Sequence, residues 1–131
     1  MRKLACVFLL ILVAACSERS TLPPPGVDSV VKTYPAHERK VRLVKGDLPS
    51  GTRYEVLGKI KAIEDFYGPQ SKAETSLAGI ARAMGADAVI NERAWHSPRL
   101  FAWAVPHAEG TAVKILSTAS VDLDAVPGEW Y

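Results

Sequence analysis

The N-terminal third of the chain limits what can fold, because its composition suits targeting and tethering better than a packed core. Arg2 and Lys3 precede an unbroken apolar run, Leu4 to Ala15. A helix of this length rises about 18 Å, whereas the hydrocarbon core of a bilayer is about 30 Å thick. The run is too short for a comfortable membrane span. Its basic start and small final residues predict a secretory signal peptide over residues 1–15.

A cysteine follows this run directly. The string Val13-Ala14-Ala15-Cys16 resembles the bacterial lipobox. The resemblance implies cleavage between Ala15 and Cys16, followed by attachment of an S-diacylglycerol group and an N-acyl chain to Cys16. Two or more acyl chains hold a protein stably on a membrane, so membrane lipid is the first predicted partner. The alternatives are an ordinary signal peptide with a chance cysteine and a retained signal anchor, the latter disfavoured by the short run.

The residue after Cys16 bears on location. In the enterobacterial sorting pattern, a residue other than Asp at this position implies transfer to the outer membrane, and here it is Ser17. We therefore expect a lipid-anchored protein of the outer membrane whose folded domain lies in the periplasm. The inner membrane is expected instead if the sorting rule differs.

Residues 16–39 are expected to be the lipidated cysteine and a tether. Pro23, Pro24 and Pro25 favour polyproline II, which acts as a semi-rigid spacer. Within this segment, residues 27–31 could instead form a short strand or dock on the body. The predicted body covers residues 40–117, and residues 118–131 form a C-terminal tail that either adds an edge strand or stays loose.

Charge and cysteine content exclude two classes of protein. Removing Arg2 and Lys3 from the 16 basic residues leaves 14, equal to the 14 acidic residues. A neutral domain does not support nucleic-acid binding, which needs an excess of Lys and Arg. Cys6 lies in the signal peptide and Cys16 is predicted to be acylated, so the body must fold without disulfides.

Patterning predicts two strands before a helix. Residues 40–46 read as an exposed edge strand with basic side chains. Residues 52–63 follow a turn at 48–51 and carry Tyr54, Val56, Gly58 and Ile60 on one expected face, with Gly58 marking a bulge or a close backbone approach.

The helix is expected over residues 71–84. Ser71 and Glu74 have the spacing of a capping box, apolar residues recur along one stripe, and Gly85 follows as a C-terminal stop.

Three further strands are expected after the helix, over residues 86–97, 99–105 and 111–116, with Ser97-Pro98 as the first turn. The predicted fold class is therefore α+β. It consists of a small, mostly antiparallel sheet with one main helix, in the order β-β-α-β-β-β.

Three segments of the body carry a family resemblance: YEVLGKI at 54–60, MGADAVINER at 84–93 and GTAVKI at 110–115. Together they resemble the YbjQ-type family, often labelled a heavy-metal-binding domain. With the lipidated cysteine and the tether, they are also similar to RcsF-type outer-membrane lipoproteins, which sense envelope stress. RcsF-type domains are stapled by disulfides, which this body lacks.

The residues themselves predict no metal site or other cofactor. The imidazoles are His37, His96 and His107, none at the spacing of a zinc site. We expect His96 and His107 to lie several residues apart in an antiparallel pairing.

Catalytic patterns are also lacking in the sequence. Ser97 follows His96 without a nucleophile elbow, and the adjacent carboxylates Glu64 and Asp65 are expected to diverge. The tryptophans are expected in the core or on a sheet face, although Trp130 and Tyr131 could form an exposed contact.

The sequence therefore predicts a non-catalytic envelope lipoprotein that presents a small domain for protein–protein interaction or envelope sensing. The alternatives are a self-assembling, ring-forming structural lipoprotein, as YbjQ-type domains are thought to be, and a metal-binding or small-ligand-binding module. The predicted protein partner is accordingly another envelope protein or a second copy of this chain.

Overall fold

A single mixed sheet and one helix make up the described fold. The computed structural model describes residues 26–116 and 121–131. The elements in chain order are β1 (Val27–Val30), β2 (Arg42–Val44), β3 (Tyr54–Ile63), α1 (Gln70–Ala83), β4 (Ala88–Arg99), β5 (Ala102–Ile115), a 3₁₀ turn (Leu123–Ala125) and β6 (Gly128–Trp130). The α+β class is confirmed, although the strand order differs from the predicted one.

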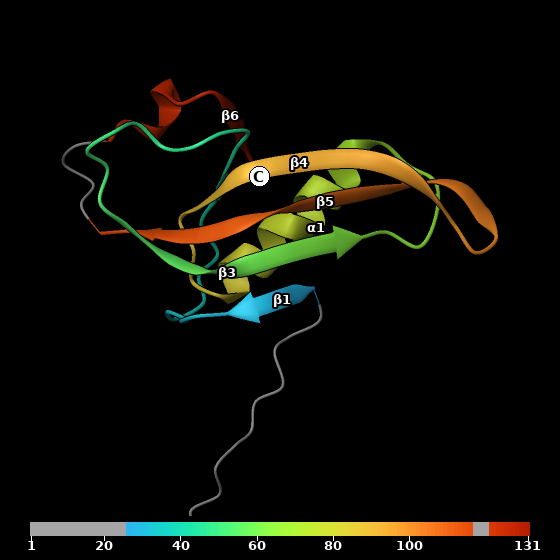
Figure 1. Ribbon diagram of the computed structural model, residues 1–131, viewed down its shortest axis with the longest axis horizontal. Coiled ribbons are helices and arrows are strands. Elements are labelled where there is room, and N and C mark those ends of the chain that lie inside the picture. The colour runs from blue at the N-terminus through green and yellow to red at the C-terminus, as the bar shows by residue number, and fades with distance from the viewer. Residues whose placement is uncertain (1–25, 117–120) are drawn as a thin grey trace, which may run out of the picture.

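The sheet order is β1-β3-β5-β4-β2-β6. Neighbouring strands are antiparallel except β2 and β4, which are parallel and are connected through β3 and α1. The long strands β3, β4 and β5 form the centre, and α1 lies across one face of the sheet (Figure 1). The sheet is therefore mostly antiparallel, as expected, but has six strands.

Both ends of the described chain add strands to the sheet. In the segment predicted as tether, β1 pairs with β3, and the Tyr34 N–H donates to the Met84 carbonyl at 2.9 Å. In the predicted tail, β6 pairs with β2 and makes the opposite edge. The packed part of the chain thus starts at Val27.

The expected bulge in β3 occurs at Gly58 and changes which residues face the core. The register with β5 shifts between Val56 and Gly58, and a Cβ on Gly58 would lie 2.0 Å from the Ser29 carbonyl oxygen. The shift leaves Val56 exposed and buries Leu57 and Ile60. The prediction that Tyr54, Val56, Gly58 and Ile60 share one face is wrong because a bulge reverses the alternation.

The helix forms where its apolar stripe predicts it, but its N-terminus is capped differently. Pro69 occupies the N-cap position with no side-chain cap bond, so the predicted Ser71–Glu74 capping box is wrong. The Glu74 carboxylate instead accepts a hydrogen bond from the Tyr131 hydroxyl. Gly85, at φ 77°, follows the C-cap and ends the helix as expected.

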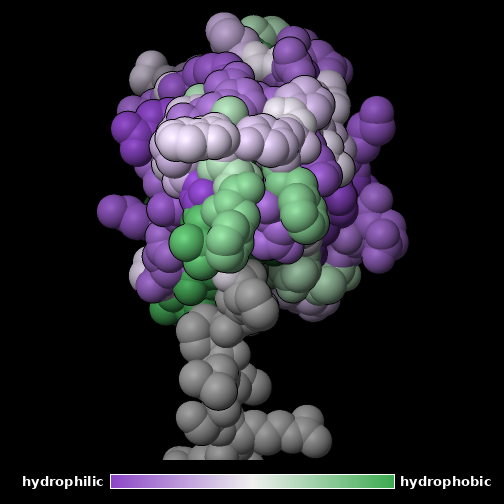
Figure 2. All heavy atoms as spheres, turned by 90° about the vertical axis from the view of Figure 1, so that its right-hand side faces the viewer, coloured by the Kyte–Doolittle hydropathy of each residue, from purple (hydrophilic) through white to green (hydrophobic). Residues whose placement is uncertain are grey.

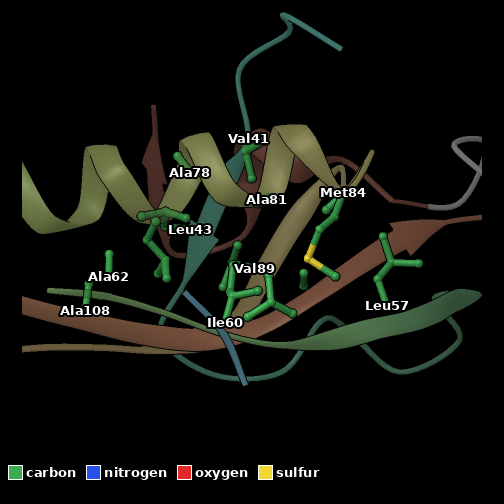
Figure 3. Packing of buried hydrophobic residues seen from close by; sticks show 14 of the residues in the cluster. Val41, Leu43, Leu57, Ile60, Ala62, Ala78, Ala81, Met84, Val89 and Ala108 are labelled. Carbon is green, nitrogen blue, oxygen red and sulfur yellow. The ribbon is translucent and has the colours of Figure 1, made fainter. Parts of the chain in front are cut away.

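The main core lies between α1 and the sheet (Figure 3). Ala73, Leu77, Ala78 and Ala81 form the buried stripe of the helix. The cluster also takes residues from five strands and from the segments beside them, including Val41, Leu43, Leu57, Ile60, Val89 and Ala108. The many alanines let the helix approach the sheet closely.

A second, smaller core covers part of the opposite face. Alternation along β4 places Ala88 and Ile90 in this cluster and Val89 in the main core. The other members come from β2, β5 and the connecting segments: Val44, Leu48, Val113, Ile115 and Val126. This end of the sheet is therefore packed on both faces.

The position of β2 corrects the expectation for residues 40–46. The strand lies between β4 and β6, and Val41, Arg42, Leu43 and Val44 are buried. The Arg42 guanidinium donates to the Val126 carbonyl at 2.6 Å. This segment is therefore an interior strand and not an exposed edge, because β6 covers its outer side.

The hairpin after the helix also differs from expectation. β4 continues through Ser97 and Pro98 to Arg99, which pairs with Ala102, so the turn consists of Leu100 and Phe101. β5 then runs without a break through Glu109 and Gly110. The two expected strands over residues 99–105 and 111–116 are therefore one, since the Ser-Pro and Glu-Gly signals lie within strands.

Candidate functional site

The β4–β5 hairpin extends beyond the end of β3. Pairing of β3 with β5 stops at Ile63 and His107, whereas pairing within the hairpin continues to Arg99 and Ala102. We call this end of the sheet the distal end, and Figure 1 shows the hairpin projecting there. It brings together several of the residues that the sequence offers as candidates and does not predict as a site, among them Ser97 and His107.

Ser97 and His107 meet at the base of the projecting hairpin. The Ser97 Oγ lies 2.7 Å from the His107 Nε2. The His107 ring also stacks on Trp95, with ring centroids 5.2 Å apart. Trp95 pairs with His107 and Ser97 with Val105, so these contacts cross between β4 and β5. The group ties the two strands of the hairpin together through their side chains.

The surroundings of His107 favour its neutral form. Burial lowers the pKa of the His107 imidazole, and the positive charges of Lys61 and Arg99 lower it further. Its Nδ1 atom is buried and has no hydrogen-bond partner among the described residues. A hydroxyl beside a neutral imidazole is part of a nucleophile–base arrangement, but in residues 26–116 and 121–131 no third group orients this imidazole.

Charged side chains frame the aromatic pair. The Arg93 guanidinium lies 4.8 Å from the Trp95 ring centroid and donates to the Glu109 carboxylate at 2.6 Å. The Lys61 ammonium lies 5.7 Å from the same centroid. Alternation from Ala108, which lies in the main core, places His107 and Glu109 on the face opposite α1. We call this surface, with Lys61, Arg93 and Trp95, the open face.

Large apolar side chains are exposed at the distal end. They are Phe66 (72%), Tyr67 (56%), Leu100 (82%), Phe101 (95%) and Trp103 (82%), and we call them the apolar tip. Figure 2 looks onto this end of the molecule and shows hydrophobic side chains gathered on it. Two segments contribute, namely the β3–α1 connection and the end of the β4–β5 hairpin. The Tyr67 hydroxyl joins them by accepting a hydrogen bond from the Trp103 N–H at 2.9 Å.

The turn of the hairpin holds Phe101 in an unfavourable conformation. Its φ of 68° lies in the left-handed region, where a bulky side chain is an outlier and glycine is the usual residue. With 95% of its surface exposed, Phe101 gains almost no packing within the chain in return. Such a strained and exposed residue is typical of a functional surface.

A shallow hollow of about 500 Å³ lies between the distal end and the first described residue of the chain. Gly26, Lys61, Asp65 and Arg99 are among the residues that line it. The Gly26 carbonyl accepts a hydrogen bond from the Lys61 N–H at 2.6 Å. The N-terminal segment therefore joins the body at the same end as the apolar tip.

The three histidines contact different groups. The His37 Nε2 lies 2.6 Å from the Ala86 carbonyl, and the His96 Nε2 lies 2.8 Å from the Gly68 carbonyl. His96 pairs with Pro106, next to His107, so the expectation of a separation by several residues is wrong. Adjacent strand positions nevertheless point to opposite faces. Among the described residues, no cluster of three His, Cys, Asp or Glu side chains could hold a metal ion.

The adjacent carboxylates Glu64 and Asp65 lie in the loop after β3 and bind different partners. The Glu64 carboxylate accepts from the Ser76 hydroxyl at 2.5 Å and lies 3.6 Å from the Lys72 ammonium. Asp65 forms an ion pair with Arg99 at 3.2 Å. They diverge as expected, although the cause is the loop rather than a strand.

The tryptophans occupy three different environments. Trp95 is half-buried against His107, whereas Trp103, near the start of β5, lies on the sheet as expected but is exposed. The Trp130 indole N–H donates to Asp124 at 2.7 Å. The apolar sequence Leu100–Trp103 could have indicated the apolar tip. It does so only if the turn is placed at Leu100 and Phe101 and not at Ser97 and Pro98.

The predicted anchor residues, Ala15 and Cys16, lie outside the described residues. Within residues 26–116 and 121–131, no helix has the length and apolar character needed to cross a membrane. Comparisons of the chain with protein-family models, with curated proteins and with solved structures found no match.

Proposed function

We propose that this chain is a lipid-anchored protein of the bacterial outer membrane that presents its α+β body to another envelope protein in the periplasm. The observation that carries the proposal is the string Val13-Ala14-Ala15-Cys16 after a short apolar run. Acylation of Cys16 by two or more chains would hold the protein stably at the lipid surface.

The arrangement of the body supports presentation at a short distance from the membrane. The packed chain begins at Val27, so ten residues separate Cys16 from Val27. A segment of this length reaches at most about 35 Å. The body would therefore work close to the lipid surface, nearer than a tether extending to residue 39 would allow.

The open face is the surface that best suits a protein partner. Trp95 is half-buried there, with the Arg93 guanidinium over its ring and the mixed charges of Lys61 and Glu109 beside it. Aromatic and arginine side chains are enriched at protein interfaces, and hot spots are enriched in Trp and Arg.

The similarity to YbjQ-type and RcsF-type domains supports the same general role. It suggests sensing or assembly in the envelope, but the staple of RcsF-type domains is not available to a body without cysteine. Self-assembly through the sheet edges is less favoured, because β1 and β6 offer only four and three residues for pairing.

The anchor is tested by the Cys16→Ser variant. We expect the wild-type chain to fractionate with the outer membrane and the variant to accumulate as an uncleaved or soluble form. Unchanged processing and membrane partition in the variant would contradict the lipoprotein assignment.

Presentation is tested by site-specific photo-crosslinking in living cells. A crosslinker at Arg93 on the open face should capture one discrete envelope protein, whereas a crosslinker at the exposed Lys40 should not. Adducts that contain only this chain would favour self-assembly. Failure to capture any protein across several growth conditions would contradict the proposal.

A further inference from the structure

We propose that the apolar tip is a membrane-contact site that inserts into the interfacial region of the lipid bilayer. The proposal rests on the proposed function, because the bilayer is the one to which Cys16 would anchor the chain. It gives the body a fixed orientation relative to the membrane and not only a tether length.

The chemistry of the tip suits a lipid interface. Its members are aromatic or aliphatic, and Tyr67 and Trp103 combine an apolar ring with a polar atom. Such residues are enriched at the boundary between headgroups and acyl chains. The hydrophobic side chains gather on one end of the molecule, so they could enter the interface together (Figure 2).

The tip is held in place before any contact forms. The Tyr67–Trp103 hydrogen bond fixes the two loops to each other. The Arg99 guanidinium contacts both the Glu64 carbonyl and the Asp65 carboxylate, at 3.4 and 3.2 Å. A preordered surface loses less conformational freedom on binding than a flexible loop. Phe101, whose backbone is in the left-handed region, lies in the turn of the hairpin with its side chain exposed.

The position of the N-terminal segment selects lipid as the occupant. Val27 pairs with Ile60, and β1 runs away from the distal end, so the chain from Cys16 reaches the body on the distal half of β3, at the hollow that Asp65 and Arg99 also line. With a reach of at most about 35 Å, this segment keeps the distal end near the anchored bilayer. A second copy or a separate protein has no comparable constraint that brings it to the tip.

Charge around the tip predicts how the contact depends on lipid composition. Lys72 is paired with Glu64 and Arg99 with Asp65, so these charges beside the β3–α1 connection balance within the part of the chain that the structure describes. An apolar insertion with so little net charge should depend weakly on anionic lipid and on salt.

Fluorescence quenching of Trp103 tests the proposal. The full chain, purified from membranes, is reconstituted into phosphatidylcholine vesicles that carry a doxyl group high on the acyl chain. The Trp103→Phe variant gives the background from Trp95 and Trp130. We expect doxyl lipid to reduce the Trp103 contribution at least about twofold, because insertion at the headgroup boundary places the indole near the quencher.

Two variants separate the tip from the rest of the fold. Leu100→Ser with Phe101→Gly removes apolar surface and supplies glycine at the left-handed position, so the hairpin should fold and quenching should be lost. Val31→Ser is the matched control, because Val31 is an exposed aliphatic residue beyond the far end of β1. Both proteins should keep the wild-type circular dichroism and melting temperature. Quenching that persists in the folded double variant would overturn the proposal.

The mass of the N-terminal peptide distinguishes failure of the tip from failure of the anchor. An acylated Cys16 with unquenched Trp103 overturns membrane contact and leaves the anchor intact. If Cys16 is not acylated, the anchor fails, and the tip is judged by adding vesicles to the same chain: quenching supports contact, and its absence overturns it. The proposal would also be overturned if Trp103 is unquenched and the chain forms dimers that the double variant abolishes. That result would mean that a second copy of the chain covers the tip.

Discussion

The two ends of the sheet treat apolar side chains in opposite ways. At the end with β2 and β6, the connecting segments fold over the face opposite α1 and bury Leu48 and Val126 with their neighbours. At the distal end, Leu100, Phe101 and Trp103 stand exposed on the projecting hairpin. One chain thus covers a sheet face with loops and leaves an apolar turn bare. The contrast shows that the two ends differ in packing, and we propose that the exposed end is the one that contacts the membrane.

The largest expected loss of stability comes from a change in the main core, between α1 and the sheet. Leu77 is fully buried between α1 and the sheet, so Leu77→Ala leaves a cavity in the main core. We expect a loss of about 3 kcal/mol in the free energy of unfolding, measured by urea denaturation. A loss below about 1 kcal/mol would mean that packing of the helix on the sheet contributes little to stability. It would contradict the contrast between packed and exposed apolar side chains.

The base of the hairpin should show an intermediate effect. Ser97→Ala removes the hydroxyl beside the His107 Nε2 and leaves the buried imidazole without that hydrogen bond. We expect a loss of about 1 kcal/mol in the free energy of unfolding. Ser97→Thr, which keeps a hydroxyl, should recover part of it. Unchanged stability in Ser97→Ala would show that the pair does not hold the hairpin.

A buried carboxylate, Glu92, should make the free energy of unfolding depend on pH. Burial raises the pKa of the Glu92 carboxyl, although the Lys45 ammonium at 3.0 Å opposes this. The folded state therefore holds this proton more tightly than the unfolded state. The resulting stability is present below the ordinary pKa of about 4.3 and is lost as the pH rises through the folded pKa.

Glu92→Gln should remove that dependence while keeping an oxygen for Lys45 to contact. We expect the variant to be more stable than wild type at pH 7 by about 1 kcal/mol and the difference to shrink toward pH 4. Thermal unfolding across this range measures both. A variant that is less stable at pH 7 would show that the ion pair outweighs the cost of burying the charge.

The smallest stability effect should come from the apolar tip. Phe101→Gly relieves the left-handed strain but also adds flexibility to the unfolded chain. We expect the free energy of unfolding to stay within about 0.5 kcal/mol of wild type or to rise. A loss of more than about 1 kcal/mol would mean that Phe101 packs within the fold and would remove the contrast between the two ends.

Local patterns in the sequence predicted much of the fold. The apolar stripe and Gly85 placed the helix to within a residue, and Gly58 marked the bulge. The consequences of these features were harder to foresee, because the bulge reverses which side chains face the core. The prediction of a capping box failed because the Glu74 carboxylate accepts a hydrogen bond from the hydroxyl of Tyr131, 57 positions away in the chain.

The structure of the distal end could not be predicted because its turn has no signal in the sequence. Ser97-Pro98 reads as a turn, but the true turn is Leu100-Phe101, a pair with no glycine or asparagine at the left-handed position. This displacement hid both the Ser97–His107 pair, which needs the correct strand register, and the exposure of Trp103. Phe101, which breaks a local rule by its left-handed backbone, lies in the apolar tip to which we assign membrane contact.

Hydroxyl-radical footprinting of the vesicle-anchored full chain tests the difference between the two ends most directly. Trp103 is more exposed in the structure than the half-buried Trp130, so it should be oxidised faster wherever both tryptophans meet only water. On vesicles, we predict that Trp103 is oxidised more slowly than Trp130, and that Leu100→Ser with Phe101→Gly restores the faster rate. Faster oxidation of Trp103 in the anchored wild-type chain would contradict the account.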